Sequence, residues 1–589
     1  MLTELNISSV VRGSLAGTCA ALALSACHMA GSHNTSRPNV IIVLTDDQGY
    51  GDLSVHGNPV LQTPVLDRLH SQSIRFTDFH SAPMCTPTRG QLMTGRDALD
   101  NGATMVCMGR SMIREELPTM ADIFRMSGYQ TAHFGKWHLG DSYPYRPQDR
   151  GFDETVHHGA WGIGSIADHH GNTYWNDTYW HNNTPEKYQG YCTDVWFNLT
   201  IEYIRKHRSE EQPFFIYLAT NCPHSPHLCD DKYSDPYLEK GMKEQVAGFF
   251  GQIANIDENM DRLLGILEET GLADNTILIY MTDNGTSSGH EVFNAGMRGH
   301  KTEPYEGGHR VPLFIRWPAG KLGKPRDIDV PAQVQDILPT LTQWCNLNIP
   351  DGVSFDGSSL VPAVKGKLNE LQERILVVEY ENPYRPEENR AVIWKKWRLV
   401  KDTELYDLSN DPGQTKDVAE QYPEVSQKLK EYYAAWKQQT ITEYQKPRYI
   451  HLGSEQQNPV MLYSSDWQGS YADNSANLFA GNQTGFWDVM VDKAGTWKFT
   501  LSRWHPASGL GLNNPMNDRQ GRNRGALPVE YARLKVGNFD QTVKTAPGQP
   551  QVVFTLPLQK GIYKVETWFL DKAKQPLCSA YYTEAGWVE

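Results

Sequence analysis

The sequence predicts an α/β domain with a mixed, mostly parallel sheet sandwiched by helices, then a small antiparallel subdomain and an added C-terminal β-sandwich. Residues 39–45 form a continuous apolar run that stops at two aspartates, as expected of a strand buried on both faces of a parallel sheet. Helical segments separate this run from later ones, and such alternation is typical of α/β domains. Further core strands are expected at 131–135, 214–219, 277–282 and 312–317.

Two segments between these strands carry clear helix signals. Thr63 is the expected N-cap of a helix that begins at Pro64, because threonine caps helix starts and proline suits the first turn. The segment 246–270 places apolar residues at helical spacing, and Gly271 follows it as a stop signal. Helices of this kind are expected to cover both faces of the sheet.

The pattern changes after about residue 374. Alternating stretches at 391–401 and 404–408 precede a helix near 423–436, which fits a small antiparallel sheet covered by one helix. Beyond Tyr444 the chain is rich in Gly, Asn and Trp with period-two stretches, the pattern of a β-sandwich. The expected parts are a signal segment at 1–27, the main α/β domain at 38–373, the subdomain at 374–444 and the sandwich at 445–589.

The overall charge excludes one class of partner. The 589 residues include 55 Lys and Arg against 69 Asp and Glu, a net charge of -14. Nucleic-acid binders depend on neutralising phosphates, so a nucleic-acid partner is not expected. Any anionic substrate must therefore meet a local basic pocket. The 9 cysteines are scattered and match neither a disulfide framework nor a zinc site.

The N-terminus has the features of an export signal. Arg12 precedes a small and apolar run at 15–26 that is too short to span a membrane. The tetrapeptide Leu-Ser-Ala-Cys at 24–27 resembles a bacterial lipobox, in which Cys27 would be acylated; the alternative is an ordinary cleaved signal peptide. We expect an exported protein of the periplasm or outer membrane, held to the membrane only by a lipid anchor at Cys27.

The pentapeptide Cys-Thr-Pro-Thr-Arg at 85–89 is the most informative motif, and Leu-Met-Thr-Gly-Arg follows at 92–96. Cys85 suits a nucleophile at a helix start, because Pro87 fits the first turn and the free N–H groups there favour an anion. Alone, the motif is equally consistent with a buried structural cysteine.

Four further motifs fall near the carboxyl ends of predicted strands, where open α/β sheets bind their ligands. They are Asp-Asp at 46–47, Gly-Lys-Trp-His-Leu-Gly at 135–140, Pro-His at 223–224 and Asp-Asn-Gly at 283–285, with a lysine at 301 beyond them. The side chains that they supply are Asp46, Asp47, Lys136, His138, His224, Asp283, Asn284 and Lys301.

The order and spacing of these motifs, with the Cys85 motif, resemble the formylglycine-dependent sulfatases over most of residues 38–345. Leu-Tyr-Asp-Leu at 405–408 and Asn-Asp-Pro at 410–412 resemble the C-terminal subdomain of the same family. The resemblance implies an alkaline-phosphatase-like fold and hydrolysis of sulfate esters. It also implies that a formylglycine-generating enzyme oxidises Cys85 to formylglycine; Thr88 stands where the family commonly has serine.

A sulfate ester is a weak electrophile with a negative charge, so its hydrolysis needs a cation, a nucleophile and an acid for the leaving alcohol. By resemblance, one metal ion is held by Asp46, Asp47, Asp283, Asn284 and the modified Cys85. Hard oxygen ligands of this kind suit Ca²⁺ better than Mg²⁺.

The resemblance also assigns roles to the catalytic residues. Asp283 is expected to deprotonate the hydrated formylglycine for attack on sulfur, while His224 and Lys301 protonate the departing oxygen. Arg89 would hold the formylglycine, and Lys136 would contact the sulfate. His138 would help to remove the second hydroxyl proton so that sulfate is expelled.

Three other residues are weaker candidates for substrate binding. His227 either lines the substrate pocket or is structural, and Arg298 and His300 either select a sugar or are exposed loop residues. Two histidine-rich runs, at 157–158 and 168–170, either line a pocket mouth or belong to ordinary loops.

Two other functions compete with a sulfatase. The first is a phosphatase. Two-zinc phosphatases need a histidine directly after an aspartate, whereas Asn284 follows Asp283 here, so a two-zinc enzyme is not expected. The alternative that remains in this class is a formylglycine-dependent phosphonate or phosphodiester hydrolase. A non-catalytic sulfated-glycan-binding lipoprotein is suggested by tryptophans in the sandwich, although such residues are usually core. We favour hydrolysis of a sulfated polysaccharide or oligosaccharide, with marine algae as one source, over a small aryl sulfate.

Overall fold

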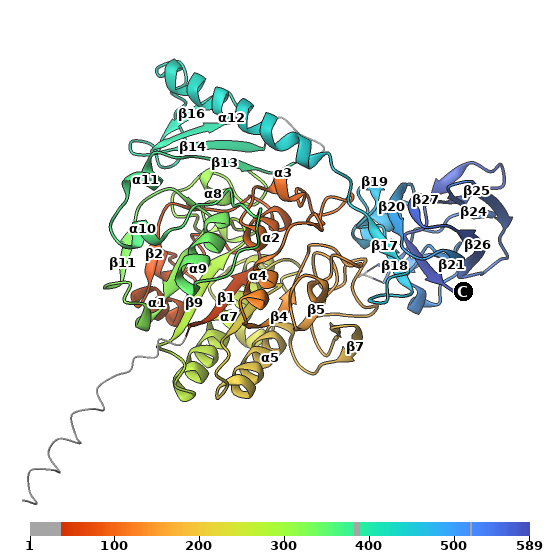
Figure 1. The fold of residues 1–589 in the computed structure, drawn as a ribbon, viewed down its shortest axis with the longest axis horizontal. Helices are drawn as coiled ribbons and strands as arrows, with labels where there is room; N and C mark the ends of the chain where they lie inside the picture. The colour runs from red at the N-terminus through yellow and green to blue at the C-terminus, as the bar shows by residue number, and fades with distance from the viewer. Residues whose placement is uncertain (1–36, 382–388, 519–520, 589) are drawn as a thin grey trace, which may run out of the picture. The chain divides into compact units, whose positions relative to one another are not determined.

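A ten-stranded mixed sheet lies at the centre of the α/β domain in the computed structural model, which describes residues 37–381, 389–518 and 521–588 (Figure 1). The strand order is β11-β2-β10-β9-β1-β8-β4-β5-β6-β7, and pairing is parallel from β9 to β5. The strands are β1 Asn39–Thr45, β2 Ile74–Phe76, β4 Gln130–Lys136, β5 Glu154–His158, β6 Thr178–His181, β7 Thr184–Lys187, β8 Phe214–Ala219, β9 Thr276–Thr282, β10 Leu313–Arg316 and β11 Arg326–Ile328.

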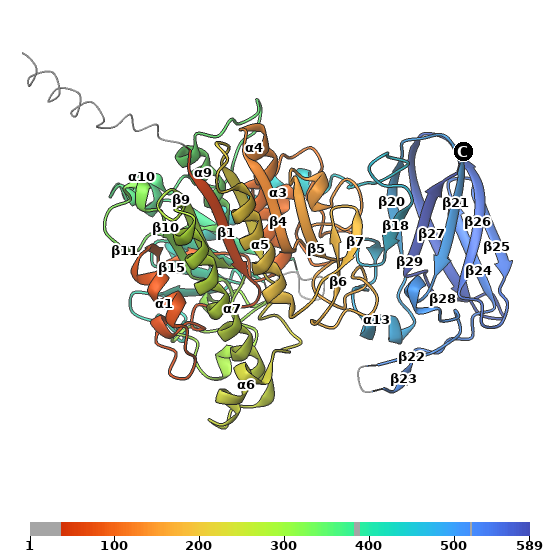
Figure 2. The same cartoon turned by 90° about the horizontal axis from the view of Figure 1, so that it is seen from below.

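Helices cover both faces of this sheet because its central strands are apolar on both sides. In β1, Val40, Ile42 and Leu44 belong to one buried cluster, while Ile41 and Val43 belong to another. Residues of α2, α4 and α9 complete the first cluster, and residues of α1, α5 and α7 complete the second (Figure 2). These helices are α1 Pro64–Ser71, α2 Cys85–Thr94, α4 Met120–Met126, α5 Cys192–His207, α7 Glu244–Glu269 and α9 Ile337–Cys345.

The parallel register brings four strand ends to one edge of the sheet. Thr45 pairs with Thr282, so the aspartates after β1 and β9 begin side by side. Leu44 and Gly135 both pair with Ala219, which places the ends of β4 and β8 at the same edge. Three of the predicted sequence motifs therefore extend β1, β4 and β9, and the segment after β8 joins them.

The core strands are confirmed: β1 and β8 have the predicted bounds, and β4, β9 and β10 agree within two residues at each end. Thr63 occupies the predicted N-cap position before Pro64, but its hydroxyl makes no capping hydrogen bond; it instead donates to Asp67 and accepts from the backbone N–H of Ser54. One local expectation was wrong. The stretch 391–401 is two strands rather than one, because the chain turns at Lys395, which has a φ of 54°.

The subdomain after the α/β domain is an antiparallel sheet in the order β13-β14-β15-β16, with α12 packed on it (Figure 1). Leu429 and Tyr433 of α12 join Val377, Val392 and Leu399 of the sheet in one buried cluster. The elements are β13 Ile375–Glu379, β14 Arg390–Trp394, β15 Trp397–Val400, β16 Glu404–Asp407 and α12 Pro423–Tyr444.

The C-terminal part is a sandwich of two antiparallel-rich sheets, with central orders β17-β20-β27-β24-β25 and β18-β29-β21-β26. Trp487, Trp497 and Trp504 are buried in its core, which is the ordinary structural use of tryptophan rather than sugar binding. The strands are β17 Ile450–Leu452, β18 Val460–Tyr463, β19 Gln468–Gly469, β20 Gly485–Val491, β21 Gly495–Ser502, β24 Tyr531–Val536, β25 Phe539–Lys544, β26 Gln551–Leu558, β27 Gly561–Leu570, β28 Pro576–Cys578 and β29 Tyr582–Trp587, with α13 Ser475–Ala480 between β19 and β20.

Residues Pro38–Glu589 group into one compact unit, so the sheets of the α/β domain, subdomain and sandwich are not separate bodies. The first strand of the subdomain begins at Ile375 and the first strand of the sandwich at Ile450; a division into domains at 374 and 445 stays a prediction. The predicted signal segment and Cys27 lie outside the described residues, and export remains a prediction. Within the described ranges, no helix is both long and apolar enough to cross a membrane.

Candidate active site

Cys85 is the first residue of α2 and is only 2% exposed. Thr88 shapes this turn: its hydroxyl accepts from Ala82 N at 3.0 Å and donates to Met84 O at 3.1 Å. Burial raises the pKa of the Cys85 thiol despite the nearby charge of Lys136. The unmodified thiol is therefore neutral near pH 7, and a neutral thiol is a poor nucleophile.

Two carboxylates lie beside Cys85, and a third, that of Asp47, belongs to the residue that bonds to one of them. Ligand atoms of Asp46, Asp283 and Cys85 lie within 4.8 Å of one another. Asp47 has a φ of 68° and donates its backbone N–H to Asp283 Oδ1 at 3.0 Å. This left-handed conformation turns the two consecutive aspartates after β1 toward one centre, although neighbouring residues of a strand point to opposite faces.

Burial and the crowding of the carboxylates shift their pKa values. Burial, followed by the charge of Asp46, raises the pKa of Asp283 to about 7. For Asp47, burial alone would raise the pKa, but Lys301 and His224 outweigh it and hold the pKa below the usual range. Negative charge at this position is thus stabilised by neighbouring cations, which is typical of a functional site.

The donor set fits a hard divalent cation. Asp46 Oδ1 and Asn284 Oδ1 are buried acceptors that lack a hydrogen-bond partner among the described residues. Asn284 donates its amide N–H to Asp47 Oδ1 at 2.9 Å, which leaves the amide oxygen available as a ligand. Oxygen atoms from carboxylates and an amide are the ligands that Ca²⁺ prefers.

Three fixed cations face the three carboxylates. Lys136 Nζ lies 2.7 Å from Asp46 Oδ2, and Arg89 Nη2 lies 2.8 Å from Asp283 Oδ2. Lys301 Nζ lies 2.7 Å from Asp47 Oδ1. The three pairs cancel in formal charge, so one divalent cation would leave the centre positive and attractive to a sulfate ester.

Two histidines complete the cluster. His138 Nδ1 lies 3.4 Å from Cys85 Sγ, and its Nε2 lies 3.1 Å from Val106 O; burial and the charge of Lys136 hold its pKa well below 6.5. His224 Nε2 lies 3.6 Å from Asp47 Oδ2, and burial with the charge of Lys301 lowers its pKa to about 3. The structure therefore brings together every catalytic and metal-binding residue that the sequence predicted.

The three weaker candidates lie in other surroundings. His227 Nε2 lies 3.0 Å from Ser288 Oγ and its Nδ1 lies 3.0 Å from Pro223 O, so its ring links two loops beside the cluster. His300 stacks on His290 with ring centres 4.3 Å apart. Arg298 stacks over Tyr305 at 3.8 Å. Selection of substrate by these residues stays a prediction.

The contacts of Arg298 predict a measurable effect on stability. Its guanidinium donates to Tyr305 Oη, Tyr406 Oη and Gln414 O at 2.8–3.0 Å, which links the α/β domain to the subdomain. We expect Arg298→Ala to lower the free energy of unfolding by about 1–2 kcal/mol, with exposed Arg208→Ala as the control. Chemical denaturation checks this; unchanged stability with altered sugar preference would instead favour the selectivity role.

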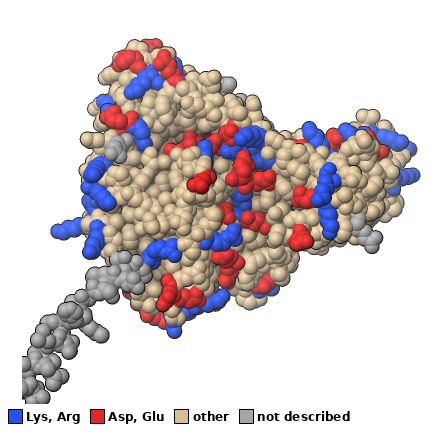
Figure 3. Space-filling model, viewed as in Figure 1, with Lys and Arg blue, Asp and Glu red and all other residues tan. Residues whose placement is uncertain are grey.

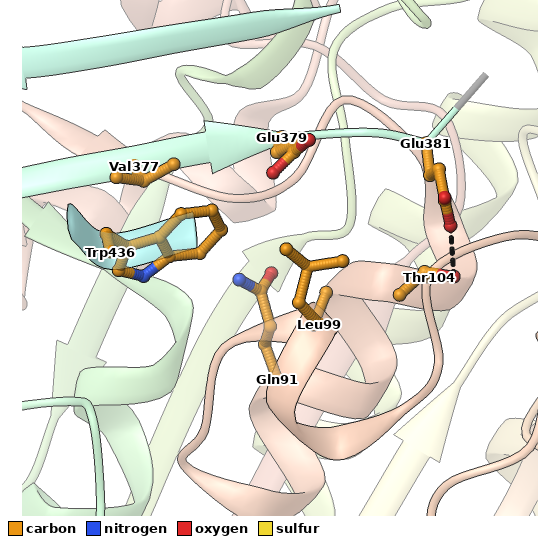
Figure 4. A pocket seen from close by; sticks show the side chains of 8 residues that line it. Gln91, Leu99, Thr104, Val377, Glu379, Glu381 and Trp436 are labelled. Carbon is orange, nitrogen blue, oxygen red and sulfur yellow. Dashed lines mark hydrogen bonds between the residues drawn. The ribbon is translucent and has the colours of Figure 1, made fainter. Parts of the chain in front are cut away.

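Two cavities of the described structure lie away from the cluster. The first encloses only about 10 Å³ among Gln91, Leu99, Glu379 and Trp436, and Thr104 donates to Glu381 at 3.0 Å beside it (Figure 4). Such a space holds about one water and no sugar ring. The second, about 620 Å³, lies between the α/β domain and the sandwich and includes Trp180. Neither is lined by a residue of the catalytic cluster.

Three aromatic side chains near the cluster come from parts of the chain that the sequence analysis did not connect with the site. Tyr380, at the end of β13, belongs to the same buried apolar cluster as Cys85, and Tyr471 of the sandwich packs against it. Trp161 lies with its ring centre 5.2 Å from that of His224. No motif or spacing in the sequence connects these three aromatic residues to Cys85.

The family of the chain follows from comparison with known proteins. The profile of the Sulfatase family matches residues 38–347, and that of the N-sulphoglucosamine sulphohydrolase C-terminal region matches 300–439. An ulvan-active sulfatase of Formosa agariphila is 30% identical over 413 residues, which are 64% of this chain and 76% of that protein. N-acetylgalactosamine-6-sulfatase of Canis lupus familiaris is 27% identical, over 59% of this chain and 69% of its own.

Solved structures share the fold. Ps i-CgsB in complex with k-i-k-neocarrahexaose aligns with a TM-score of 0.64 at 23% identity, covering 70% of this chain and 95% of its own. BT4656 in complex with its substrate D-glucosamine-2-N,6-O-disulfate aligns with a TM-score of 0.55 at 20% identity, covering 70% and 99%. These likenesses show the alkaline-phosphatase-like fold. The Sulfatase profile over residues 38–347, more than half of the chain, together with the named sulfatase relatives, shows that the chain is a sulfuric ester hydrolase and belongs to the sulfatase family.

Proposed function

We propose that this sulfatase removes sulfate from a sulfated polysaccharide or oligosaccharide, using a formylglycine at Cys85 and one bound calcium ion. The observation that carries the proposal is the position of Cys85, buried at the start of α2 within 4.8 Å of two carboxylates and 3.4 Å from His138. A neutral thiol there has little chemistry of its own, whereas an aldehyde at the same position, once hydrated, supplies a hydroxyl nucleophile.

Asp46, Asp47, Asp283 and Asn284 would hold the calcium ion, which when bound neutralises the carboxylates and polarises sulfate oxygens. The described residues then divide the remaining work. Arg89 donates to Asp283 and to the backbone carbonyl of Lys136, so it fixes both strand ends around the nucleophile. Lys136 pairs with Asp46 and adds a positive charge that attracts the sulfate.

The position of each side chain determines the part that we assign to it in proton transfer. Asp283 is one of the two carboxylates with a ligand atom within 4.8 Å of Cys85 Sγ, and we assign it the proton of the attacking hydroxyl. Lys301 and His224 both lie against Asp47, and each side chain is 15% exposed, so both can reach a leaving oxygen that arrives from solvent. Lys301 keeps its proton and is assigned as the acid, while His224, whose low pKa leaves it neutral, lies beside the same oxygen. His138 faces Cys85 itself and is suited to take the proton that accompanies release of sulfate.

The proposed substrate class comes from relatives and from charge. The ulvan-active sulfatase and the carrageenan-oligosaccharide complex are similar proteins whose names refer to sulfated polysaccharides. Acidic and basic side chains are interspersed on the face shown in Figure 3, with no broad basic field there. Recognition of an anionic chain by a protein of net charge -14 is therefore expected to depend on the buried catalytic cations.

A defined panel of substrates tests the proposal. The matured protein is incubated with sulfated oligosaccharides from ulvan, carrageenan and glycosaminoglycans, and released sulfate is measured beside phosphate and phosphonate esters. We expect release from at least one oligosaccharide. A preference for phosphonates would favour the second candidate, since phosphonate monoester hydrolase of Agrobacterium radiobacter shares the fold with a TM-score of 0.50.

Lys301 offers a test of the leaving-group assignment. We expect Lys301→Ala to lower kcat by about 10²–10³-fold, because its charge acts where negative charge develops in the transition state. Lys243→Ala is the matched control, since Lys243 is 75% exposed and pairs with Glu291 rather than with a carboxylate of the cluster. Initial rates of sulfate release are the readout; a kcat within threefold of wild type would contradict the role.

A further inference from the structure

A segment of the sandwich lies against the catalytic cluster. Residues 464–473 follow β18 and end just before α13, outside the matched family profiles, which end at residue 439. Two loops of the α/β domain contact this segment: the loop 159–168 after β5 and the loop 103–111 after α3 (Ala98–Asn101). Both loops also contact catalytic histidines.

The loop 159–168 is anchored on Asp473. Trp161 Nε1 donates to Asp473 O at 2.9 Å, and the backbone N–H of Ile166 donates to the same oxygen at 3.4 Å. Asp473 is 2% exposed, and its carboxylate accepts from Asn474 Nδ2 at 2.8 Å and from the Tyr471 hydroxyl. Two neighbouring side chains hold the Asp473 carboxylate, and this contact fixes the position of the Asp473 backbone carbonyl.

The anchored indole lies beside the histidine that faces the leaving group. The ring centres of Trp161 and His224 are 5.2 Å apart, with an angle of 40° between the planes. Trp161 is partly exposed, and the His224 side chain is 15% exposed. A sugar whose sulfated oxygen reaches His224 must place its ring near this indole.

The loop 103–111 carries the second connection. His138 Nε2 lies 3.1 Å from Val106 O, and Ser111 Oγ donates to Asp466 Oδ1 at 3.4 Å. Gly109 approaches the same segment so closely that an added Cβ would lie 3.0 Å from Gln468 Cγ. Tyr471 packs against the buried cluster that contains Cys85. The sandwich thus supports the catalytic site on two sides.

We propose that Trp161 is a specificity-determining residue that stacks on the sugar ring of the leaving group, and that Asp473 of the sandwich positions it. The inference rests on the proposed hydrolysis of a sulfated glycan. Flat aromatic side chains offer a large apolar face with a polar edge, which suits the apolar face of a pyranose. The sandwich therefore contributes to substrate recognition without presenting its own buried tryptophans.

Kinetics of full-length variants test the inference. We expect Trp161→Ala to raise KM for the hydrolysed sulfated oligosaccharide about tenfold, with kcat within about threefold, because ground-state contact is lost while His224 stays in place. Trp180→Ala is the matched control, since Trp180 comes from the neighbouring strand β6 and lines the separate 620 Å³ cavity.

Asp473 is tested by its conservative variant. Asp473→Ala keeps the backbone carbonyl that accepts from Trp161 but removes the carboxylate that Asn474 and Tyr471 hold in place, so it should raise KM in the same direction. Asp473→Asn, which retains one acceptor for Asn474, should restore much of the loss. A merely structural role would lower the melting temperature of both variants and leave KM unchanged. If Trp161→Ala lowers kcat at constant KM, Trp161 supports His224 rather than the sugar. If only Trp180→Ala changes KM, the sugar binds in the 620 Å³ cavity. Either result overturns the inference.

Binding separates this inference from the proposed function. Calorimetry with the inactive Cys85→Ala protein, with and without Trp161→Ala, measures affinity for the sulfated oligosaccharides without turnover. We expect about tenfold weaker binding without the indole. Equal affinities, or no binding by either protein, overturn the inference. Failure of the matured wild type to release sulfate from any oligosaccharide instead contradicts the proposed function.

Discussion

Cys85→Ala is expected to lower sulfatase kcat by at least about 10⁴-fold, because the change removes the nucleophile and leaves only binding and electrostatic contributions. Cys85 is buried at the start of α2, and alanine fits the helix without strain. The melting temperature should therefore change little. Released sulfate from the matured protein is the measurement.

A buried cysteine elsewhere supplies the control. Cys345→Ala removes a thiol at the end of α9, in a different part of the buried core, and should leave kcat near wild type. If Cys85→Ala retains a tenth or more of the wild-type rate while Cys345→Ala behaves normally, another group performs the attack and the assignment of Cys85 is wrong.

Removal of calcium is expected to have the second largest effect. Three carboxylates and one amide oxygen converge at the strand ends, and two of their buried oxygens lack hydrogen-bond partners within the described ranges. Thorough chelation should abolish sulfate release, and added Ca²⁺ should restore it. Bound ligand also stabilises the folded state, by on the order of 3 kcal/mol at a hundredfold excess over Kd. A calcium-dependent rise in melting temperature is thus a readout independent of activity.

Asp46 distinguishes a specific site from general charge screening. In Asp46→Ala the calcium-dependent rise in melting temperature should vanish, whereas exposed Asp231→Ala should retain it. Full activity of a demonstrably metal-free protein, or an unchanged response of Asp46→Ala to calcium, would show that the carboxylates serve only as partners for Lys136, Arg89 and Lys301.

Much of the fold and of the catalytic centre could be predicted because the same stretches of sequence indicate both the buried strands and the site residues. The apolar run of β1 is followed by Asp46 and Asp47, so one stretch identifies a buried strand and two of the proposed metal ligands. β9 does the same with Asp283 and Asn284. In a parallel sheet, neighbouring strands end at one edge, and motifs distant in sequence therefore meet in space.

Other features lacked a local signal. Thr63 occupies the predicted N-cap position, but contacts with Ser54 and Asp67 take up its hydroxyl, so the expected capping hydrogen bond does not form. Trp161 and Asp473 are separated by more than half of the chain length, and each has an ordinary sequence context. Their contact depends on how the sandwich packs on the α/β domain, which neither residue periodicity nor a family motif encodes.

The chemical state of Cys85 tests the central claim most directly. The protein is produced together with a formylglycine-generating enzyme, assayed for sulfate release, and digested so that the peptide spanning Cys85 can be analysed by mass spectrometry. Active preparations are expected to carry an aldehyde at residue 85, which an aldehyde-specific probe also labels, and activity should rise with the modified fraction. An active preparation in which this peptide is entirely an unmodified thiol would show that formylglycine is not the nucleophile.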